Sequence, residues 1–289
     1  MTTAITTCIC TMNRPGELEA ALRSLGACRP RPDQIIVSDD SPESDRRSES
    51  VCGHFAEVVY LRGPRRGLGA NRNAAVSAVT GSWVHFIDDD VIVPADFYEI
   101  AHGVIESSTR RAMISGIERR HASDADPSPV RVTPPYAGFW AHLLPAGARS
   151  PNCVVINAAL FPRELLTETK FDERLKYGCE ESDMTCHALA NDYVLLSEPR
   201  LVVDHYPSTQ NRSIYGNWVV ASQVHAGLKR QWLYRQSGIR TVGYLILAVP
   251  RLVLYHFKSG GLSGGTSASI QAVRGLGYFA ALLRSRRAA

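Results

Sequence analysis

Three adjacent carboxylates, Asp88, Asp89 and Asp90, stand at the end of an apolar run in the segment HFIDDDVIVP. Carboxylates this close repel one another, and they are rarely buried unless a cation or a hydrogen-bond donor compensates them. A solvated acidic turn is the ordinary alternative, but the apolar residues on both sides favour a half-buried cluster. Mg²⁺ and Mn²⁺ prefer oxygen ligands, and Mg²⁺ is commonly held by one or two carboxylates together with substrate phosphates. The triplet therefore predicts a divalent metal site that handles a phosphate-bearing molecule.

A second segment carries groups that would bind such phosphates. The run RGPRRGLGANRN, residues 62–73, places four arginines around a Gly-Leu-Gly turn that opens a predicted helix. Arginine side chains and the N–H groups at a helix N-terminus both attract phosphate. We favour Arg72, inside the helix, as the phosphate contact, whereas Arg65 and Arg66 fit a solvated loop equally well. The run is neither a dinucleotide-binding fingerprint nor a Walker A sequence, which argues against NAD and P-loop chemistry.

A third group of acids, Glu180, Glu181 and Asp183, opens a predicted helix over 180–190. The helix dipole stabilises acids in a first turn, and this alone accounts for Asp183. The two adjacent glutamates after Gly178 suggest a further role, because a carboxylate beside a metal and diphosphate site is able to deprotonate an acceptor hydroxyl.

The elements that position these residues alternate regularly in the first half of the chain. The alternation of strands with helices indicates βαβ units and a mainly parallel sheet, which binds ligands at the carboxyl ends of its strands. Asp39, Asp40 and the Asp triplet fall at such ends. The predicted elements are strands at 4–10, 34–38, 58–61 and 83–87, and helices at 15–25 and 67–79.

The rest of the chain is predicted to hold a long loop, a few more strands and a helical C-terminal region. The loop covers 121–151, and its aromatic residues Tyr136, Phe139 and Trp140 are candidates for the acceptor site, because aromatic faces suit sugar rings. Strands are predicted at 153–161, 194–196 and 201–204. From Ser213 onward apolar residues recur at helical spacing. The expected fold class is α/β, with a sheet flanked by helices and followed by C-terminal helices.

Composition sets limits on partners and compartment. The net charge of +4 is too small to indicate nucleic acid, and it suits an anionic small molecule or an anionic membrane surface. Seven irregularly spaced cysteines and the lack of a basic leader segment predict a cytoplasmic protein with reduced thiols. The apolar run 242–257 is interrupted by Pro250 and Arg251, and it fits a pair of core helices or a contact with the inner face of a membrane. The oligomeric state is left open, with a homodimer as one option.

Five motifs in this order resemble the family 2 glycosyltransferases, which have the GT-A fold. The motifs are ITTCICTMNRP, IIVSDDSPESD, GLGANRNAAVSAVTGSWVHFIDDD, NAALFPRELLTETKFDERLKYGCEESDM and LVVDHYP. The resemblance covers residues 3–207. It implies a catalytic domain at 1–210, with a nucleotide-sugar half at 1–118 and an acceptor half at 119–210, followed by the helical region at 211–289.

The resemblance implies a role for each matching position. Asp39 or Asp40 would meet the base and Asp88 the ribose, while His205 fits a metal ligand or a structural, hydrogen-bonded histidine. The implied nucleotide-binding positions are Thr11, Arg14, Asp39, Asp40, Arg72, Asp88 and Asp89. The implied metal positions are Asp90, Asp88 and His205. The implied catalytic positions are Glu181 and Glu180, with Trp140 and Asp183 on the acceptor side.

The activity implied is transfer of a sugar from a nucleoside-diphosphate sugar to an acceptor hydroxyl, with Mg²⁺ or Mn²⁺ and with inversion at the sugar carbon. The expected donor is a UDP-sugar, with dTDP- and GDP-sugars as alternatives, and the acceptor is a glycan, a lipid-linked molecule or a natural product. A sugar-phosphate nucleotidyltransferase is the rival enzyme, although CTMNRPGELEA lacks its Gly-rich basic loop. A non-catalytic carbohydrate-binding protein on the same fold is the third hypothesis.

The sequence departs from the family pattern at three places. Ser41-Pro42 follows Asp40 where Gly-Ser is usual, and Asn71 replaces the usual alanine before Arg72. Glu181 stands where the family has its catalytic aspartate, so its carboxylate lies one methylene further out. Glu180 and Asp183 therefore remain alternative bases.

Overall fold

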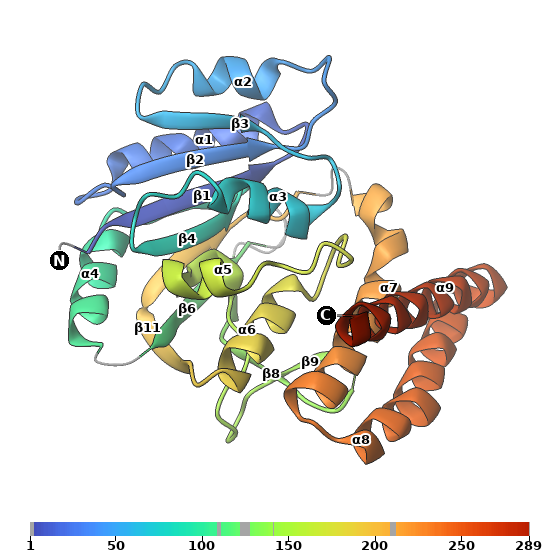
Figure 1. The fold of residues 1–289 in the computed structure, drawn as a ribbon. Helices are drawn as coiled ribbons and strands as arrows, with labels where there is room; N and C mark the ends of the chain where they lie inside the picture. Colours follow the sequence, from blue (N-terminus) through green and yellow to red (C-terminus); the bar gives the residue numbers. More distant parts are fainter. Residues whose placement is uncertain (1–2, 109–110, 122–127, 141, 209–211, 289) are drawn as a thin grey trace.

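The computed structural model describes residues 3–108, 111–121, 128–140, 142–208 and 212–288. A nine-stranded sheet forms the centre of the molecule, and the C-terminal helices pack together beyond one end of it (Figure 1). The strands lie in the order β3-β2-β1-β4-β10-β6-β11-β5, with β7 beside β6.

The first half of the sheet is parallel, as the alternating pattern predicts. Each strand pairs in parallel with its neighbour across β3, β2, β1 and β4. The strands are β1 Ile5–Thr11, β2 Gln34–Asp39, β3 Val58–Arg62 and β4 Trp83–Asp88. The helices that connect them are α1 Pro15–Ala27, α2 Arg47–Cys52 and α3 Leu68–Val76. Pro15 stands at the first helical position of α1, where its missing N–H costs no hydrogen bond.

The sheet separates two hydrophobic cores, because side chains alternate between its faces. Along β1, Ile5 and Ile9 join a core with α1 and α4 Phe97–Ser107, whereas Cys8 joins the core on the opposite face. The second core is completed by α3, by α5 Arg163–Glu168 and by α6 Glu180–Ala190. Burial on both faces explains the near-continuous apolar composition of β1 and β2.

The second half of the sheet is mixed rather than parallel. β10 runs antiparallel between β4 and β6, while β11 runs parallel to β6 and antiparallel to β5. β11 is one strand with a register shift between Ser197 and Val202, where the sequence pattern predicts two strands. The strands are β5 Val91–Ile92, β6 Ala112–Arg120, β10 Ala159–Pro162 and β11 Val194–His205. The α/β fold class is confirmed, and the mixed pairing arises because β10 enters from a 3-10 turn, η1 Ile156–Ala158, instead of a crossover helix.

The predicted loop at 121–151 contains three short strands in its described part. β7 Val130–Val132 extends the sheet beside β6, and β8 Pro135–Ala137 pairs with β9 Leu143–Pro145 in a separate hairpin. Residues 122–127 and 141 of this loop lie outside the described residues.

The C-terminal region is helical, as predicted, and has its own hydrophobic core. Its inner side chains include Val224, Tyr244 and Ala272, and Phe139 and Trp140 pack against them. α9 is broken at Gly261, whose φ of 62° places it in the left-handed region. The elements are α7 Arg212–Lys229, η2 Arg230–Tyr234, α8 Gly238–Gly243, η3 Tyr244–Ala248 and α9 Val249–Ala288.

Candidate active site

The ends of β1, β2 and β4 bring the predicted acids to one edge of the sheet. Thr11 pairs in register with Asp39, and Cys10 pairs with Asp88. The carboxyl ends of adjacent parallel strands therefore meet here, as the sequence pattern predicts. A cleft at this edge is lined by Thr11, Arg14, Asp40, the Asp triplet and His205, among others.

Thr11 and Arg14 hold the middle acid of the triplet. The Thr11 hydroxyl donates to Asp89 over 2.7 Å, and the Arg14 Nη1 donates to Asp89 over 2.9 Å and to Asp90 over 3.1 Å. Burial raises the pKa of Asp89 to about 7, although the positive charge of Arg14 opposes this rise. Thr11 and Arg14 were both predicted as nucleotide contacts, and both line the cleft. They also hold the Asp triplet in place through their hydrogen bonds.

Asp88, Asp90 and His205 form the one cluster of candidate metal ligands found among the described residues. One ligand atom from each of the three lies within 4.8 Å of the others. β11 brings His205 here, because His205 pairs with Val91 of β5, next to the triplet. The Nε2 atom of His205 lies 3.1 Å from Oδ1 of Asp90, and the backbone N–H of Ser208 donates to Oδ2 of Asp90.

The donor set fits a divalent cation of the Mg²⁺ or Mn²⁺ type, because two carboxylates and one imidazole supply hard oxygen ligands and one nitrogen. Within the described part of the chain, the buried Oδ1 of Asp90 is approached by Nε2 of His205 and by no other hydrogen-bond donor. Asp88 keeps 34% of its side chain exposed toward solvent, so its carboxylate is accessible to a substrate. A buried carboxylate oxygen that meets only an imidazole, beside an accessible carboxylate, is an arrangement that a cation would complete.

A second layer of polar residues orients His205. Glu118 of β6 lies 2.8 Å from Nδ1 of His205, which leaves Nε2 facing Asp90. The Asn157 side chain donates to Glu118 and accepts a hydrogen bond from the Asp88 backbone N–H. It therefore links Asp88 to the residue that orients His205. Burial alone would lower the pKa of His205, but the contacts with Asp90 and Glu118 raise this pKa to about 10. A metal would displace the proton held on this imidazole.

Glu118, Asn157 and Ser208 were not predicted from the sequence. Glu118 carries a usable signal, because it is an acid that follows the apolar run MISGI within β6. Asn157 opens the fourth family-like motif, although no role was assigned to it. Ser208 contributes a backbone N–H, for which a sequence holds no signal.

Arg72 lies between the cluster of candidate metal ligands and the glutamates of α6. Its guanidinium is buried, 3.6 Å from Oδ1 of Asp88 and 3.8 Å from Oε1 of Glu180, and it lies over the ring of Phe171. Across the residues that the structure describes, its Nη1 makes no hydrogen bond, and neither does Oε2 of Glu180. A buried guanidinium with an unused donor is prepared to bind an anion such as a phosphate.

The three acids of α6 have different surroundings. Glu180 is buried beside Arg72, and burial followed by the charge of Glu181 raises the pKa of Glu180 to about 8. Glu181 is half-buried, and burial raises its pKa although Arg72 opposes the rise. Asp183 faces away from the cleft, because its carboxylate accepts hydrogen bonds from Lys229 and Tyr234 of the C-terminal helices. Of the three, Glu181 is the one that combines partial exposure with proximity to Arg72.

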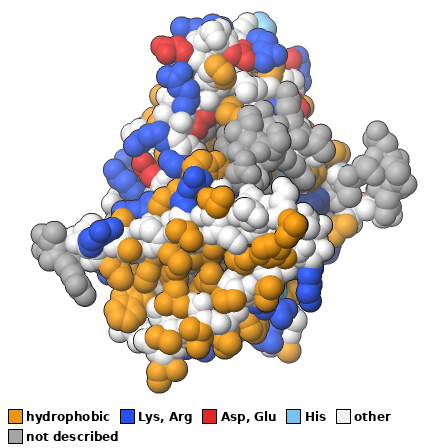
Figure 2. All heavy atoms as spheres, turned by 90° about the vertical axis from the view of Figure 1, so that its right-hand side faces the viewer, with side chains coloured by type: hydrophobic (Ala, Val, Ile, Leu, Met, Phe, Trp, Pro, Cys, Tyr) orange, Lys and Arg blue, Asp and Glu red, His pale blue; other side chains and the backbone are white. Residues whose placement is uncertain are grey.

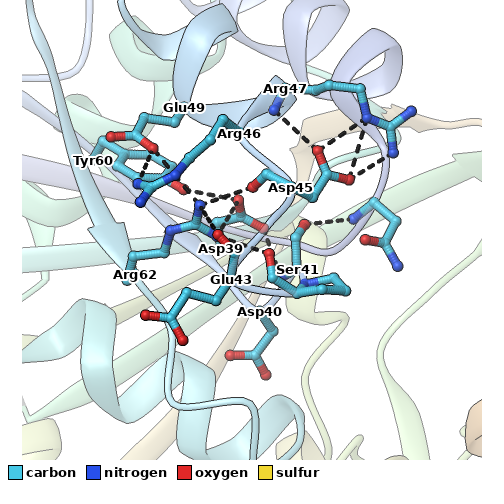
Figure 3. A network of polar contacts seen from close by, with 12 residues as sticks. Asp39, Asp40, Ser41, Glu43, Asp45, Arg46, Arg47, Glu49, Tyr60 and Arg62 are labelled. Carbon is cyan, nitrogen blue, oxygen red and sulfur yellow. Dashed lines mark hydrogen bonds and ion pairs between the residues drawn. The ribbon is translucent and has the colours of Figure 1, made fainter.

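Asp39 and Asp40 have separate environments (Figure 3). Asp39 is buried and accepts hydrogen bonds from the Tyr60 hydroxyl and from the Ser41 backbone N–H, both over 2.9 Å. Asp40 points away from this network, lines the cleft, and accepts the Arg65 backbone N–H over 2.8 Å. Asp40 is therefore the acid that a ligand in the cleft would meet.

Two further groups of predicted residues lie outside this cleft. The side chains of Arg65 and Arg66 are more than half exposed and are ion-paired with Glu43 and Glu173. Trp140 lines a different pocket, between the β8–β9 hairpin and helices α7 and α9, where the Arg251 guanidinium lies 5.0 Å from its ring centre.

Comparison with known proteins bears on the family and the fold of the chain. Residues 6–143 match the family described as glycosyl transferase family 2. Residues 1–349 of TarS from S. aureus share this fold with a TM-score of 0.52 and 18% identity, over 92% of this chain and 90% of that one. The structure of TarS itself gives a TM-score of 0.51 at 18% identity, and this chain spans 49% of its length. No curated protein matches the sequence. The fold is the GT-A fold of glycosyltransferases.

Proposed function

Since this protein is a glycosyltransferase that carries a family 2 domain over residues 6–143, we propose that it is a metal-dependent, inverting enzyme. It would move a sugar from a nucleoside-diphosphate sugar, with a UDP-sugar as the first donor to test, to an acceptor hydroxyl. The observation that carries this proposal is the convergence of Asp88, Asp90 and His205 within 4.8 Å, beside the buried Arg72.

Asp88, Asp90 and His205 would hold the metal, which when bound supplies positive charge to the diphosphate leaving group. Arg72 would add its own charge from the other side, through the donor that is unused in this structure. Asp40 and the backbone around Arg65 would border the nucleoside.

The acceptor proton needs a base, and Glu181 is the proposed one. As the acceptor oxygen forms its bond to the sugar C1 atom, the C1–O bond to the diphosphate breaks and its electron pair leaves with the phosphate oxygen. The acceptor hydroxyl proton passes to the carboxylate of Glu181. A single displacement from the opposite face inverts C1, and the family resemblance supports this stereochemistry. Glu180, held beside Arg72 at 3.8 Å, would position its neighbour and the guanidinium.

Calorimetry with UDP, in the presence and absence of Mn²⁺, tests the metal and nucleotide assignments. Replacing Asp90 by Asn keeps its size and removes the charge, and we expect UDP affinity to fall about tenfold or more, as it should in EDTA. Asp96→Asn is the matched control, because Asp96 is exposed at the start of α4 and outside the cleft. Equal affinity for UDP in wild type with Mn²⁺, in wild type with EDTA and in Asp90→Asn would contradict the metal site.

Product analysis separates this activity from its rivals. A glycosyltransferase releases a nucleoside diphosphate, a nucleotidyltransferase exchanges pyrophosphate, and a carbohydrate-binding protein releases neither. Donor screening with UDP-, dTDP- and GDP-sugars identifies the nucleotide.

A further inference from the structure

The charge of the chain is divided unevenly between its two parts. All 28 Asp and Glu residues lie within 1–204, whereas residues 205–289 contain eleven Lys or Arg and no acid. Two of these cations, Lys229 and Arg230, are buried in the helical core, but Arg251, Lys258 and Arg284 are exposed. The C-terminal helices therefore present a purely cationic set of charged side chains.

The same helices present large apolar side chains to the outside. Residues 238–260 bury Thr241, Tyr244 and Ala248 on their inner side, as an amphipathic helix should. Their outer side is also apolar, since Ile239 is 90% exposed, Ile246 65% and Leu254 58%. A helix that is apolar all round belongs in a protein core or against a lipid phase.

The apolar side chains form one face and are not scattered. Figure 2 shows them gathered over the C-terminal part of the molecule, with Lys and Arg around them and the acidic side chains confined to the upper part. Leu262, just beyond the break at Gly261, is 82% exposed. Contiguous apolar patches of this kind mark interaction surfaces.

We propose that the outer face of residues 238–262 rests on the surface of a lipid bilayer that contains anionic lipids. Charge complementarity selects this partner, because acid-free helices with apolar and cationic side chains match acyl chains below negatively charged headgroups. Arg251 and Lys258 are exposed in the same stretch of helix, and long basic side chains are able to extend to the headgroup level. Tyr255, which is also exposed, is a residue type enriched at that level.

A second copy of the chain is a poorer partner for this face. A two-fold contact would bring the face against itself, and residues 205–289 hold no acid to neutralise the facing cations. An anionic bilayer supplies these counter-charges.

The face lies along the membrane and does not cross it. The segment Gly238–Arg286 is long and apolar enough for a span by length and composition. However, Gly261 breaks it, Arg251 interrupts its first arm, and both arms pack on the core built around α7. This inference does not rest on the proposed function.

Vesicle flotation of the full chain tests the proposal, with phosphatidylcholine vesicles prepared with and without phosphatidylglycerol. We expect the protein to float with the anionic vesicles, to float at least about tenfold less with the neutral ones, and to be released by high salt. Ile246→Ser combined with Leu254→Ser should lower the binding constant about tenfold or more. Its matched control is Val59→Ser with Val130→Ser, which removes two exposed apolar side chains from strands β3 and β7.

A second pair of variants isolates the charge contribution. Arg251→Gln with Lys258→Gln should weaken binding to anionic vesicles by about fivefold per residue. Arg31→Gln with Arg200→Gln, which removes two exposed arginines from the catalytic part, should leave binding unchanged. The UDP affinity of the Ile246/Leu254 variant should equal that of the wild type, which separates membrane binding from the proposed catalysis.

The proposal would be overturned if the wild-type protein stayed in solution with anionic vesicles, or if the Ile246/Leu254 variant floated as well as the wild type. Bound protein that resists an alkaline carbonate wash would also overturn it, because it would show a membrane span. A dimer in sedimentation experiments that the Ile246/Leu254 variant dissociates, without vesicle binding, would instead assign the face to contacts between copies.

Discussion

The part built around the sheet and the C-terminal helices distribute charged and apolar side chains differently. In the part built around the sheet, apolar side chains fill both faces of the sheet and the acids of the candidate site collect at the strand ends, beside a cleft. In the helices, two cations lie inside, where Lys229 bridges Asp172 and Asp183, while the large apolar residues Ile239 and Ile246 lie outside. A buried charge is thus paired with a partner inside the molecule, whereas an exposed apolar patch indicates a partner outside it.

The largest expected effect lies on the catalytic side of this comparison. Glu181→Gln removes the proposed base, so turnover should fall roughly 10²- to 10⁴-fold while donor affinity is retained, because the diphosphate contacts lie elsewhere. Glu181→Asp is the sharper probe, because it restores the family residue with a shorter reach. Steady-state kinetics and donor titration measure both quantities. Near-normal turnover in Glu181→Gln, with loss of activity in Glu180→Gln or Asp183→Asn, would move the base to another residue.

Lys229 tests whether the C-terminal helices depend on the charge that they bury. Its Nζ donates to Asp172 over 2.9 Å and to Asp183 over 2.6 Å, and Lys229→Met would leave two buried carboxylates without it. Losing one partner of a buried pair typically costs about 3–5 kcal/mol of unfolding free energy. Urea unfolding measures this cost. The matched control is Arg23→Met, whose partner Glu19 sits at the surface, and an equal loss in both variants would refute the distinction.

Acidic pH should lower the stability of the fold through His85, a histidine that is buried in the sheet in its neutral form. Burial lowers the pKa of His85 to about 4, and its ring meets the Asn157 carbonyl and the Tyr98 hydroxyl. The unfolded chain takes up the proton near pH 6.5 and the folded chain only near pH 4. This contribution to stability is therefore complete above pH 6.5 and is lost as the pH falls to 4, by up to about 3 kcal/mol. Urea titrations across that range should show a shallower loss in His85→Gln, and parallel curves would exclude His85 as the source.

The smallest expected effect falls where the two parts meet. Trp140, in the connection between β8 and β9, packs against the C-terminal helices, and Trp140→Ala should raise the acceptor KM about 3- to 10-fold with little change in donor KM. Trp232→Ala, at an exposed position of η2, is the control. Equal changes in both KM values would show that Trp140 supports structure only.

Several features of the site are predictable from local sequence because local rules decide them. Helix α6 begins and ends as predicted, at Glu180 and Ala190, since acids favour a helix N-terminus. Strand ends gather Asp39 and Asp88 at one edge, because parallel strands of alternating βα units share an orientation. The order of the motifs along the chain was enough to indicate the family.

Other features depend on pairings between distant segments, which no local pattern encodes. Glu118 and His205 meet only because β6 and β11 lie side by side, and Arg14 reaches Asp89 across 75 residues of chain. β6 was not predicted, because its apolar residues do not alternate with polar ones, and a short apolar run without alternation does not identify a strand by its periodicity. The apolar composition of residues 238–262 is visible in the sequence, but which side chains turn inward onto Val224 and which remain exposed was decided only by packing against α7.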